Sequence, residues 1–143
     1  MLKVLFVCVH NAARSQMAEA FLNRLGAGRF HAESAGLEKG TLNPYVVRAM
    51  AEIGYDIADN RVKSVFDFYK QAREYDLVIK VCDASAGQAC PVFPSAVATF
   101  QWDFRDPASF TGSDEEILAQ VREVRDAIHT RIEEMLRVIQ LQA

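Results

Sequence analysis

Five residues lie between a cysteine and an arginine in the segment CVHNAARS, residues 8–15. The segment follows the apolar run Val4–Val7 and precedes a helical pattern that begins near Ser15. A loop between a strand and a helix directs backbone N–H groups into a concavity, and the helix dipole adds positive potential there. The planar fork of Arg14 can bind two oxygens of a tetrahedral anion. The spacing therefore predicts an oxyanion site in which Cys8 is a thiolate nucleophile.

The remaining residues of this loop complete the predicted site. Ser15 is placed to donate a hydrogen bond to the Cys8 thiolate, and small side chains allow the backbone to approach a ligand closely. We expect oxyanion binding by Cys8, Val9, His10, Asn11, Ala12, Ala13, Arg14 and Ser15. The simplest interpretation of His10 is a loop position without a catalytic role. The alternative for the whole segment is a buried structural cysteine with Arg14 as a surface charge, which the position between strand and helix disfavours.

Two more cysteines and an aspartate follow later apolar runs. Cys82 comes directly after Asp76–Val81, Cys90 follows shortly afterwards, and Asp106 lies beyond Ala96–Trp102. One thiol is sufficient to hydrolyse a phosphate ester, so three thiols in this arrangement indicate electron transfer as well. Taken singly, Cys82 could be a core thiol and Cys90 a surface thiol.

Strand and helix patterns alternate along the chain. The expected strands are Val4–Val7, Arg29–Ala35, Asp76–Val81 and Ala96–Trp102. Four helices are expected: Ser15–Leu25, a second helix that Asn43 caps and Gly54 closes, Val65–Arg73, and a long final helix that begins at a Ser113/Glu116 capping box. This alternation predicts an α/β fold of three layers, with a central four-stranded parallel sheet flanked by helices. Ligands of such sheets lie beyond the carboxyl ends of the strands, where Cys8, Cys82 and Asp106 should meet.

Composition restricts the other possibilities. The 143 residues predict a single domain, 1–143, with 50% hydrophobic and 24% charged residues. The net charge of −3 gives no reason to expect nucleic acid or an anionic membrane as a partner, and no apolar run is long enough to span a bilayer. The three histidines lack ligand spacing, so we expect no metal and no bound cofactor. Reduced thiols without a signal peptide predict a cytoplasmic protein, expected to be a monomer.

Several motifs together resemble one known family. They are the loop C-x-x-N-x-x-R-S at Cys8, Asn11, Arg14 and Ser15, the Q-M-A-E of residues 16–19, the S-A-G of residues 34–36, the Cys82…Cys90-Pro91 pair, and W-x-F-x-D-P at Trp102, Phe104, Asp106 and Pro107. Over essentially its whole length, the chain resembles the thioredoxin-coupled arsenate reductases built on the low-molecular-weight tyrosine phosphatase fold. Seven residues separate Cys82 from Cys90, where the family commonly has six. Lys63 or Ser64 replaces the aspartate that helps to bind potassium in one branch, so we expect no cation site, and Asn11 and Glu19 should serve the structure of the loop.

The resemblance implies reduction of arsenate to arsenite and a role in arsenical resistance. Cys8 would attack arsenic with Arg14 stabilising the developing charge, and Asp106 would protonate the departing oxygen. Cys82 would then attack Cys8, and Cys90 would move the disulfide to the Cys82–Cys90 pair. An external thiol reductant would complete the cycle, with thioredoxin expected and glutaredoxin or glutathione as alternatives. Asp103 competes with Asp106 for the acid role on position alone, and only the family pattern selects Asp106.

Two other functions stay open from the sequence. A low-molecular-weight tyrosine phosphatase would hydrolyse phosphate monoesters through a cysteinyl-phosphate intermediate at the same loop. The segment DPASF after the fourth strand has no tyrosine to grip an aromatic substrate, which favours a small inorganic oxyanion. A phosphate-sensing or redox-interaction module without catalysis would not need Cys8, Arg14 and Asp106 together.

Overall fold

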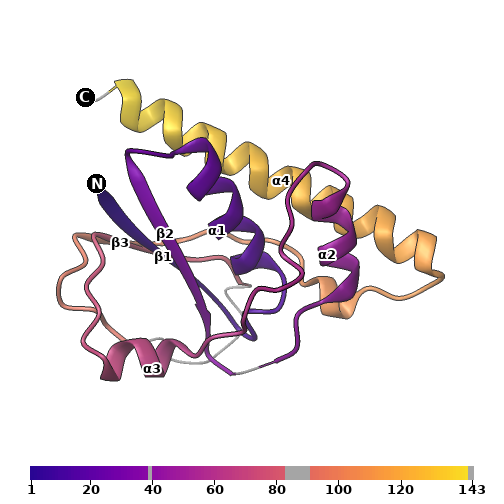
Figure 1. Cartoon of the computed structure of the whole chain (residues 1–143), viewed down its shortest axis with the longest axis horizontal. Coiled ribbons are helices and arrows are strands. Elements are labelled where there is room, and N and C mark those ends of the chain that lie inside the picture. Colours follow the sequence, from indigo (N-terminus) through magenta and orange to yellow (C-terminus); the bar gives the residue numbers. More distant parts are fainter. Residues whose placement is uncertain (39, 83–90, 142–143) are drawn as a thin grey trace.

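The centre of the molecule is a four-stranded parallel sheet (Figure 1). The computed structural model describes residues 1–38, 40–82 and 91–141. The strands are β1 (Leu2–Cys8), β2 (Phe30–Gly36), β3 (Leu77–Lys80) and β4 (Ala98–Gln101), arranged in the order β2-β1-β3-β4. This arrangement confirms the predicted fold class, and it places β1 in the interior of the sheet, between β2 and β3.

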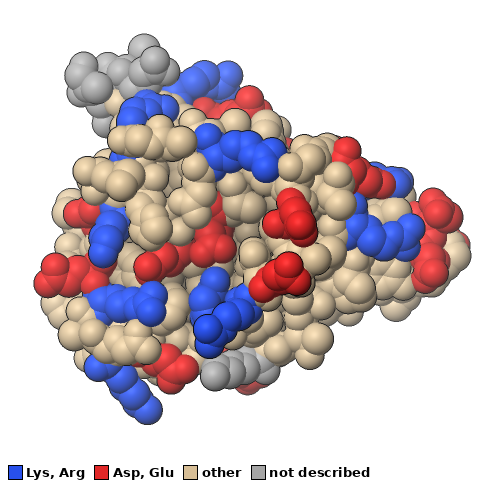
Figure 2. All heavy atoms as spheres, in the orientation of Figure 1, with Lys and Arg blue, Asp and Glu red and all other residues tan. Residues whose placement is uncertain are grey.

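Helices cover both faces of the sheet and complete three layers (Figure 1). They are α1 (Arg14–Leu25), α2 (Pro44–Ala51), α3 (Val65–Lys70), the short 3₁₀ helix η2 (Pro107–Ser109) and α4 (Asp114–Leu141). The helices α1, α2 and α4 pack on one face, and α3 packs on the other. Figure 2 shows acidic and basic side chains interspersed over the visible surface.

The alternation of side chains along β1 explains how one strand serves two cores. Val4, Phe6 and Cys8 pack in the layer with α1, α2 and α4, whereas Leu5 and Val7 pack towards α3. Successive side chains of a strand point to opposite faces, so a strand buried on both faces is apolar throughout. Cys8 therefore lies on the face that carries α1, the helix that follows the predicted oxyanion loop.

The residues expected to cap the starts of α2 and α4 do so, whereas α3 ends earlier than the sequence predicts. The Asn43 side chain accepts hydrogen bonds from two amides of α2, and Ser113 and Glu116 form the capping box at the start of α4. The predicted helix Val65–Arg73 was too long at its C-terminus. Ala72 has a φ of 55°, a left-handed conformation that ends a helix, and α3 accordingly stops at Lys70.

Two strands are also shorter at both ends than the sequence predicts. The runs Asp76–Val81 and Ala96–Trp102 form the strands Leu77–Lys80 and Ala98–Gln101. The flanking residues still bind to neighbouring backbone, since Val81 N–H donates to Val7 O and Trp102 N–H donates to Lys80 O, each at 2.8 Å. The hydrogen-bonded sheet thus extends past the formal strand ends towards the candidate site.

Candidate active site

Parallel pairing brings Cys8 and Cys82 to the same edge of the sheet. Val7 lies beside Lys80 in the β1–β3 register, so Cys8 ends β1 where the chain continues from β3 through Val81 to Cys82. Both cysteines are free thiols in one core cluster, with 2% of Cys8 and 6% of Cys82 exposed. Cys90, the third cysteine singled out in the sequence, lies outside the described residues.

The sulfur of Cys8 accepts hydrogen bonds from its own loop. Its Sγ lies 2.8 Å from Ser15 Oγ and 3.2 Å from the Asn11 amide nitrogen. Asn11 Nδ2 donates to the same Ser15 hydroxyl oxygen at 2.8 Å, which leaves the hydroxyl hydrogen to be donated to sulfur. Hydrogen bonds to a charged form favour that form, so this arrangement suits a thiolate.

Asn11 holds the loop in shape through its buried side chain. The residue has a φ of 54°, a left-handed conformation that asparagine adopts more readily than most residues. Besides Ser15, its Nδ2 donates to Ser34 Oγ at 3.0 Å, and its Oδ1 accepts from Gln16 Nε2 at 3.0 Å and from the Lys63 amide at 2.9 Å. The asparagine therefore connects the loop to α1, to β2 and to the segment before α3.

Substitution Asn11→Ala should destabilise the fold. It removes these hydrogen bonds and leaves buried donors and acceptors without their partners, and alanine is less tolerant of the left-handed backbone. We expect a loss of about 3 kcal/mol in the free energy of unfolding, measured by urea denaturation followed by circular dichroism. The matched control is Asn23→Ala, which also removes side-chain hydrogen bonds to backbone, at Ala32, but away from the loop. An Asn11 variant as stable as wild type would contradict this role.

The backbone of β2 approaches the loop so closely that only glycine fits. A Cβ on Gly36 would lie 2.7 Å from the Asn11 amide nitrogen and 2.7 Å from the His10 carbonyl carbon. The Ser-Ala-Gly segment of the sequence thus supplies both a hydroxyl partner for Asn11, at Ser34, and the space in which the loop lies.

Arg14 is buried and aimed at the cavity above Cys8. Only 3% of the residue is exposed, its Nη1 donates to the Phe104 carbonyl at 3.0 Å, and its Nη2 lies 3.6 Å from Asp106 Oδ2. Asp106 also accepts from the Ala108 amide at 3.0 Å as the cap of η2. The cavity is lined by Cys8, His10, Ala12, Ala13, Arg14, Asn43, Asp106 and Ala108. The alternative in which Arg14 is a surface charge is therefore wrong.

The other polar candidates of the sequence lie elsewhere or play different parts. His10 lines the cavity, but its Nε2 is 3.3 Å from the Glu38 carboxylate and the ring is partly exposed. Asp103 accepts from the Gln101 side chain at 3.1 Å and is not among the residues that line the cavity. The position of Asp106 beside Arg14 favours it over Asp103 as the acid.

Sequence reasoning missed two contributors to the site. Asn43 was noted as a helix cap, yet it also lines the cavity, and its amide donates to Ala12 O at 2.9 Å. The Phe104 carbonyl orients Arg14, and a backbone acceptor of this kind leaves no mark in residue types. A cap that follows the second strand at the carboxyl edge of the sheet could have indicated Asn43.

A lysine ammonium lies beside the partly buried carboxylate of Glu19 in α1. Lys63 Nζ is 3.6 Å from Glu19 Oε1. Burial raises the pKa of Glu19, and the neighbouring Lys63 charge and hydrogen bonds from Lys63 and Ser34 counteract part of this rise. Lys63, one of the two residues that the sequence placed in the position of the family's aspartate, thus pairs with Glu19.

The Cys82 thiol has a different environment from that of Cys8. Burial raises the pKa of Cys82 above its ordinary value, while the charge of Arg14 and, more weakly, that of Lys80 lower it. The Arg14 guanidinium is thus one of the charges that act on the Cys82 thiol, which lies at the same sheet edge as Cys8.

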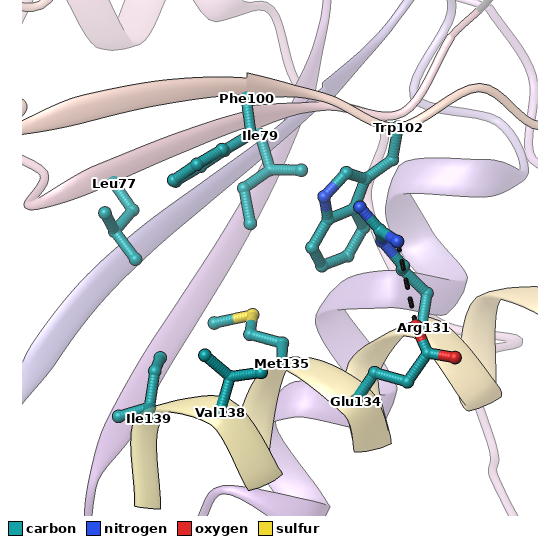
Figure 3. Close-up of a pocket in the computed structure, with 9 residues that line it drawn as sticks. All are labelled: Leu77, Ile79, Phe100, Trp102, Arg131, Glu134, Met135, Val138 and Ile139. Atoms are coloured by element: carbon teal, nitrogen blue, oxygen red, sulfur yellow. Dashed lines mark ion pairs between the residues drawn. The ribbon is translucent and has the colours of Figure 1, made fainter. Parts of the chain in front are cut away.

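A separate apolar hollow is lined in part by Trp102 (Figure 3). Its volume is about 460 Å³, and it opens between the β3–β4 edge and the end of α4. Its lining residues are Leu77, Ile79, Phe100, Trp102, Arg131, Glu134, Met135, Val138 and Ile139. Cys8, Arg14 and Asp106 line the smaller cavity and not this hollow, and Cys82 is among the lining residues of neither.

The described residues hold neither a metal-binding cluster nor a membrane-spanning helix. Within residues 1–38, 40–82 and 91–141, no three or more His, Cys, Asp or Glu side chains cluster in a way that could hold a metal ion. In the same part of the chain, no helix combines the length and the apolar character needed to cross a membrane.

Comparisons with known proteins agree with this geometry. An arsenate reductase of Halalkalibacterium halodurans is 39% identical over 129 residues, which are 90% of this chain and 91% of that protein. A glutaredoxin arsenate reductase of Synechocystis is 34% identical over 139 residues, 97% of this chain and 99% of that protein. A solved structure described as an arsenate reductase in the phosphate binding state superposes with a TM-score of 0.80 at 34% identity, covering 97% of this chain and 99% of that one.

The match extends to a family model over nearly all of the sequence. The model of the low molecular weight phosphotyrosine protein phosphatases matches residues 3–143. These residues include the oxyanion loop, both described cysteines and the Asp106 segment. The chain belongs to the low molecular weight phosphotyrosine protein phosphatase family.

Proposed function

We propose that this protein is an arsenate reductase. Cys8 is the nucleophile that attacks arsenate, and Cys82 then forms a disulfide with Cys8 as arsenic is reduced. The observation that carries the proposal is the burial of Cys82 at the same sheet edge as Cys8, within the electrostatic reach of Arg14. Hydrolysis of a phosphate ester at this loop requires Cys8, Arg14 and an acid but has no use for a second thiol. The similarity to arsenate reductases at 34–39% identity supports the same activity.

The first step forms a covalent bond between sulfur and arsenic. The Cys8 thiolate attacks the arsenic(V) of arsenate, the S–As bond forms, and one As–O bond breaks. Arg14 and the loop amides stabilise the negative charge on the equatorial oxygens. Asp106, 3.6 Å from Arg14, donates a proton to the departing oxygen, which leaves as water.

The second step is the reduction itself. The Cys82 thiolate attacks the Cys8 sulfur, the S–S bond forms, and the S–As bond breaks with its electron pair remaining on arsenic. Arsenic(V) becomes arsenic(III) and departs as arsenite, while two thiols are oxidised to one disulfide. No external reductant is needed up to this point.

Turnover needs a route for the disulfide to leave the buried site. We propose that Cys90 attacks Cys82, which frees Cys8 and transfers the disulfide to the Cys82–Cys90 pair. A protein dithiol then reduces this pair by thiol–disulfide exchange. We assign thioredoxin to this step, with glutaredoxin and glutathione as the competing reductants, and we propose that residues 1–143 work as one cytoplasmic, monomeric domain.

The decisive experiment couples arsenate to thiol oxidation. NADPH oxidation is followed with thioredoxin and thioredoxin reductase, then with glutathione and glutaredoxin, in the presence and absence of arsenate. We expect arsenate-dependent oxidation, and single-turnover arsenite release should rise with pH because burial raises the pKa of the attacking Cys82 thiol. Aryl phosphate hydrolysis, which does not use Cys82, should not follow that titration. No arsenite from the reduced enzyme at any pH would refute the function.

Phosphate-ester hydrolysis is the second candidate and is specifically favoured by the shared loop. The Cys8 sulfur, Arg14 and Asp106 belong to residues that line one cavity, which supports this reaction as well. We therefore expect weak hydrolysis of a small aryl phosphate alongside arsenate reduction, which makes this reaction an internal measure of an intact oxyanion loop.

A further inference from the structure

We propose that Gln101 is a positioning residue for Cys82 and that it holds this thiol against Cys8 for the disulfide-forming step. This role rests on the proposed arsenate reduction and belongs to a residue outside the oxyanion loop. The Gln101 side chain lies at the end of β4, and its Nε2 donates a hydrogen bond to the backbone carbonyl of Cys82.

The hydrogen bond from Gln101 to the Cys82 carbonyl takes the place of a backbone hydrogen bond between β3 and β4. Gln101 pairs with Lys80 in register, and the Trp102 amide donates to the Lys80 carbonyl at 2.8 Å. In a parallel ladder, alternate carbonyls of one strand face the same neighbour, so the next carbonyl that faces β4 is that of Cys82. The Gln101 side chain binds this carbonyl where the formal strands have already ended. The backbone of Cys82 is thereby kept in line with the sheet.

A neighbouring carboxylate fixes the orientation of the glutamine amide. Gln101 Nε2 also donates to Asp103 Oδ1 at 3.1 Å. Asp103 can only accept hydrogen bonds when ionised, so it selects the amide rotamer in which the nitrogen faces Cys82. This assigns a part to Asp103 that differs from the acid role considered from the sequence.

The backbone of Cys82 is therefore held from two sides of its strand. On one side the preceding amide, Val81 N–H, donates to Val7 O beside Cys8, and on the other the Gln101 side chain binds the Cys82 carbonyl. Attack of one sulfur on another requires close approach and alignment, so loss of the second support should lower the rate of that step. The same loss should make the buried Cys82 thiol more accessible to reagents.

The test uses Gln101→Met, which keeps the length of the side chain and removes the amide. We expect single-turnover release of arsenite to slow about fivefold, corresponding to the loss of one hydrogen bond. Aryl phosphate hydrolysis should stay unchanged, because it does not involve Cys82. Alkylation of Cys82 by iodoacetamide, quantified by peptide mass spectrometry, should become at least about threefold faster by the same reasoning.

Two controls separate positioning from general damage to β4. Thr99→Val changes an exposed residue of the same strand, two positions from Gln101, and should leave both rates at wild-type values. Asp103→Asn should show an intermediate defect, since its amide no longer selects one rotamer of Gln101. Equal slowing of hydrolysis and arsenite release in Gln101→Met would reveal structural damage and overturn the proposal.

The alkylation measurement keeps this proposal distinct from the function itself. If the wild-type enzyme released no arsenite, arsenate reduction would fail, but faster alkylation of Cys82 in Gln101→Met would still support the positioning of that thiol. If the wild-type enzyme reduced arsenate and the variant matched it in both arsenite release and alkylation, Gln101 would have no such role.

Discussion

Replacement Cys82→Ser should abolish arsenate turnover while aryl phosphate hydrolysis continues. A serine hydroxyl cannot form the disulfide that releases arsenic(III), so we expect arsenate-dependent NADPH oxidation to fall by at least about a hundredfold. The oxyanion loop does not include Cys82, and serine fits its space, so kcat/KM for the aryl ester should remain within about twofold of wild type.

The Cys8→Ser variant provides the comparison for this prediction. It removes the nucleophile of both reactions and should lose both together. Arsenate reduction by the Cys82→Ser enzyme at the wild-type rate would show that electrons reach arsenic by another route, and the relay from Cys8 to Cys82 would be wrong.

Replacement Arg14→Lys should impair both reactions. The guanidinium is buried and fixed by the Phe104 carbonyl, with a second nitrogen facing Asp106. A lysine ammonium keeps the charge but cannot bind two oxygens of the oxyanion in one plane. We expect kcat/KM for arsenate and for the aryl phosphate to fall by about 10²–10³, as for removal of one oxyanion-stabilising group.

The neighbouring arginine supplies a control for Arg14→Lys. Arg105 is exposed, lies next to Asp106 in the chain, and contacts Gln120 and the Phe110 ring. Arg105→Lys should therefore keep both activities, and urea denaturation should show that each variant is folded. A large defect in Arg105→Lys, or a small one in Arg14→Lys, would contradict the assignment of the oxyanion to Arg14.

The sequence was sufficient to predict the layers of the fold and the edge of the sheet at which Cys8 and Cys82 lie. The continuous apolar run in β1, which is buried on both faces, and the period-3.6 patterns in α1 and α4 reflect the packing of whole faces, which residue types record directly. The parallel order then follows from the alternation of strands and helices, and it brings Cys8, Cys82 and Asp106 to one edge.

The details that the sequence could not provide depend on backbone atoms and on single conformations. The Phe104 carbonyl that holds Arg14 and the Cys82 carbonyl that binds Gln101 carry no residue signature. The positive φ of Ala72 ended α3 before Arg73, although alanine is a strong helix former. In each case the structure depends on the local geometry of the backbone, which the types of the residues do not reveal.

The burial of Trp102 has a practical consequence for studying this protein. It is the only tryptophan of the 143 residues, it is 8% exposed, and its ring packs near Phe6 and beneath the Arg131 guanidinium. Two residues further along the chain, the Phe104 carbonyl binds Arg14. The tryptophan fluorescence of the molecule therefore arises from a single ring in the segment after β4 that anchors the anion-binding arginine, so a shift in its emission on adding arsenate would report on that anchor.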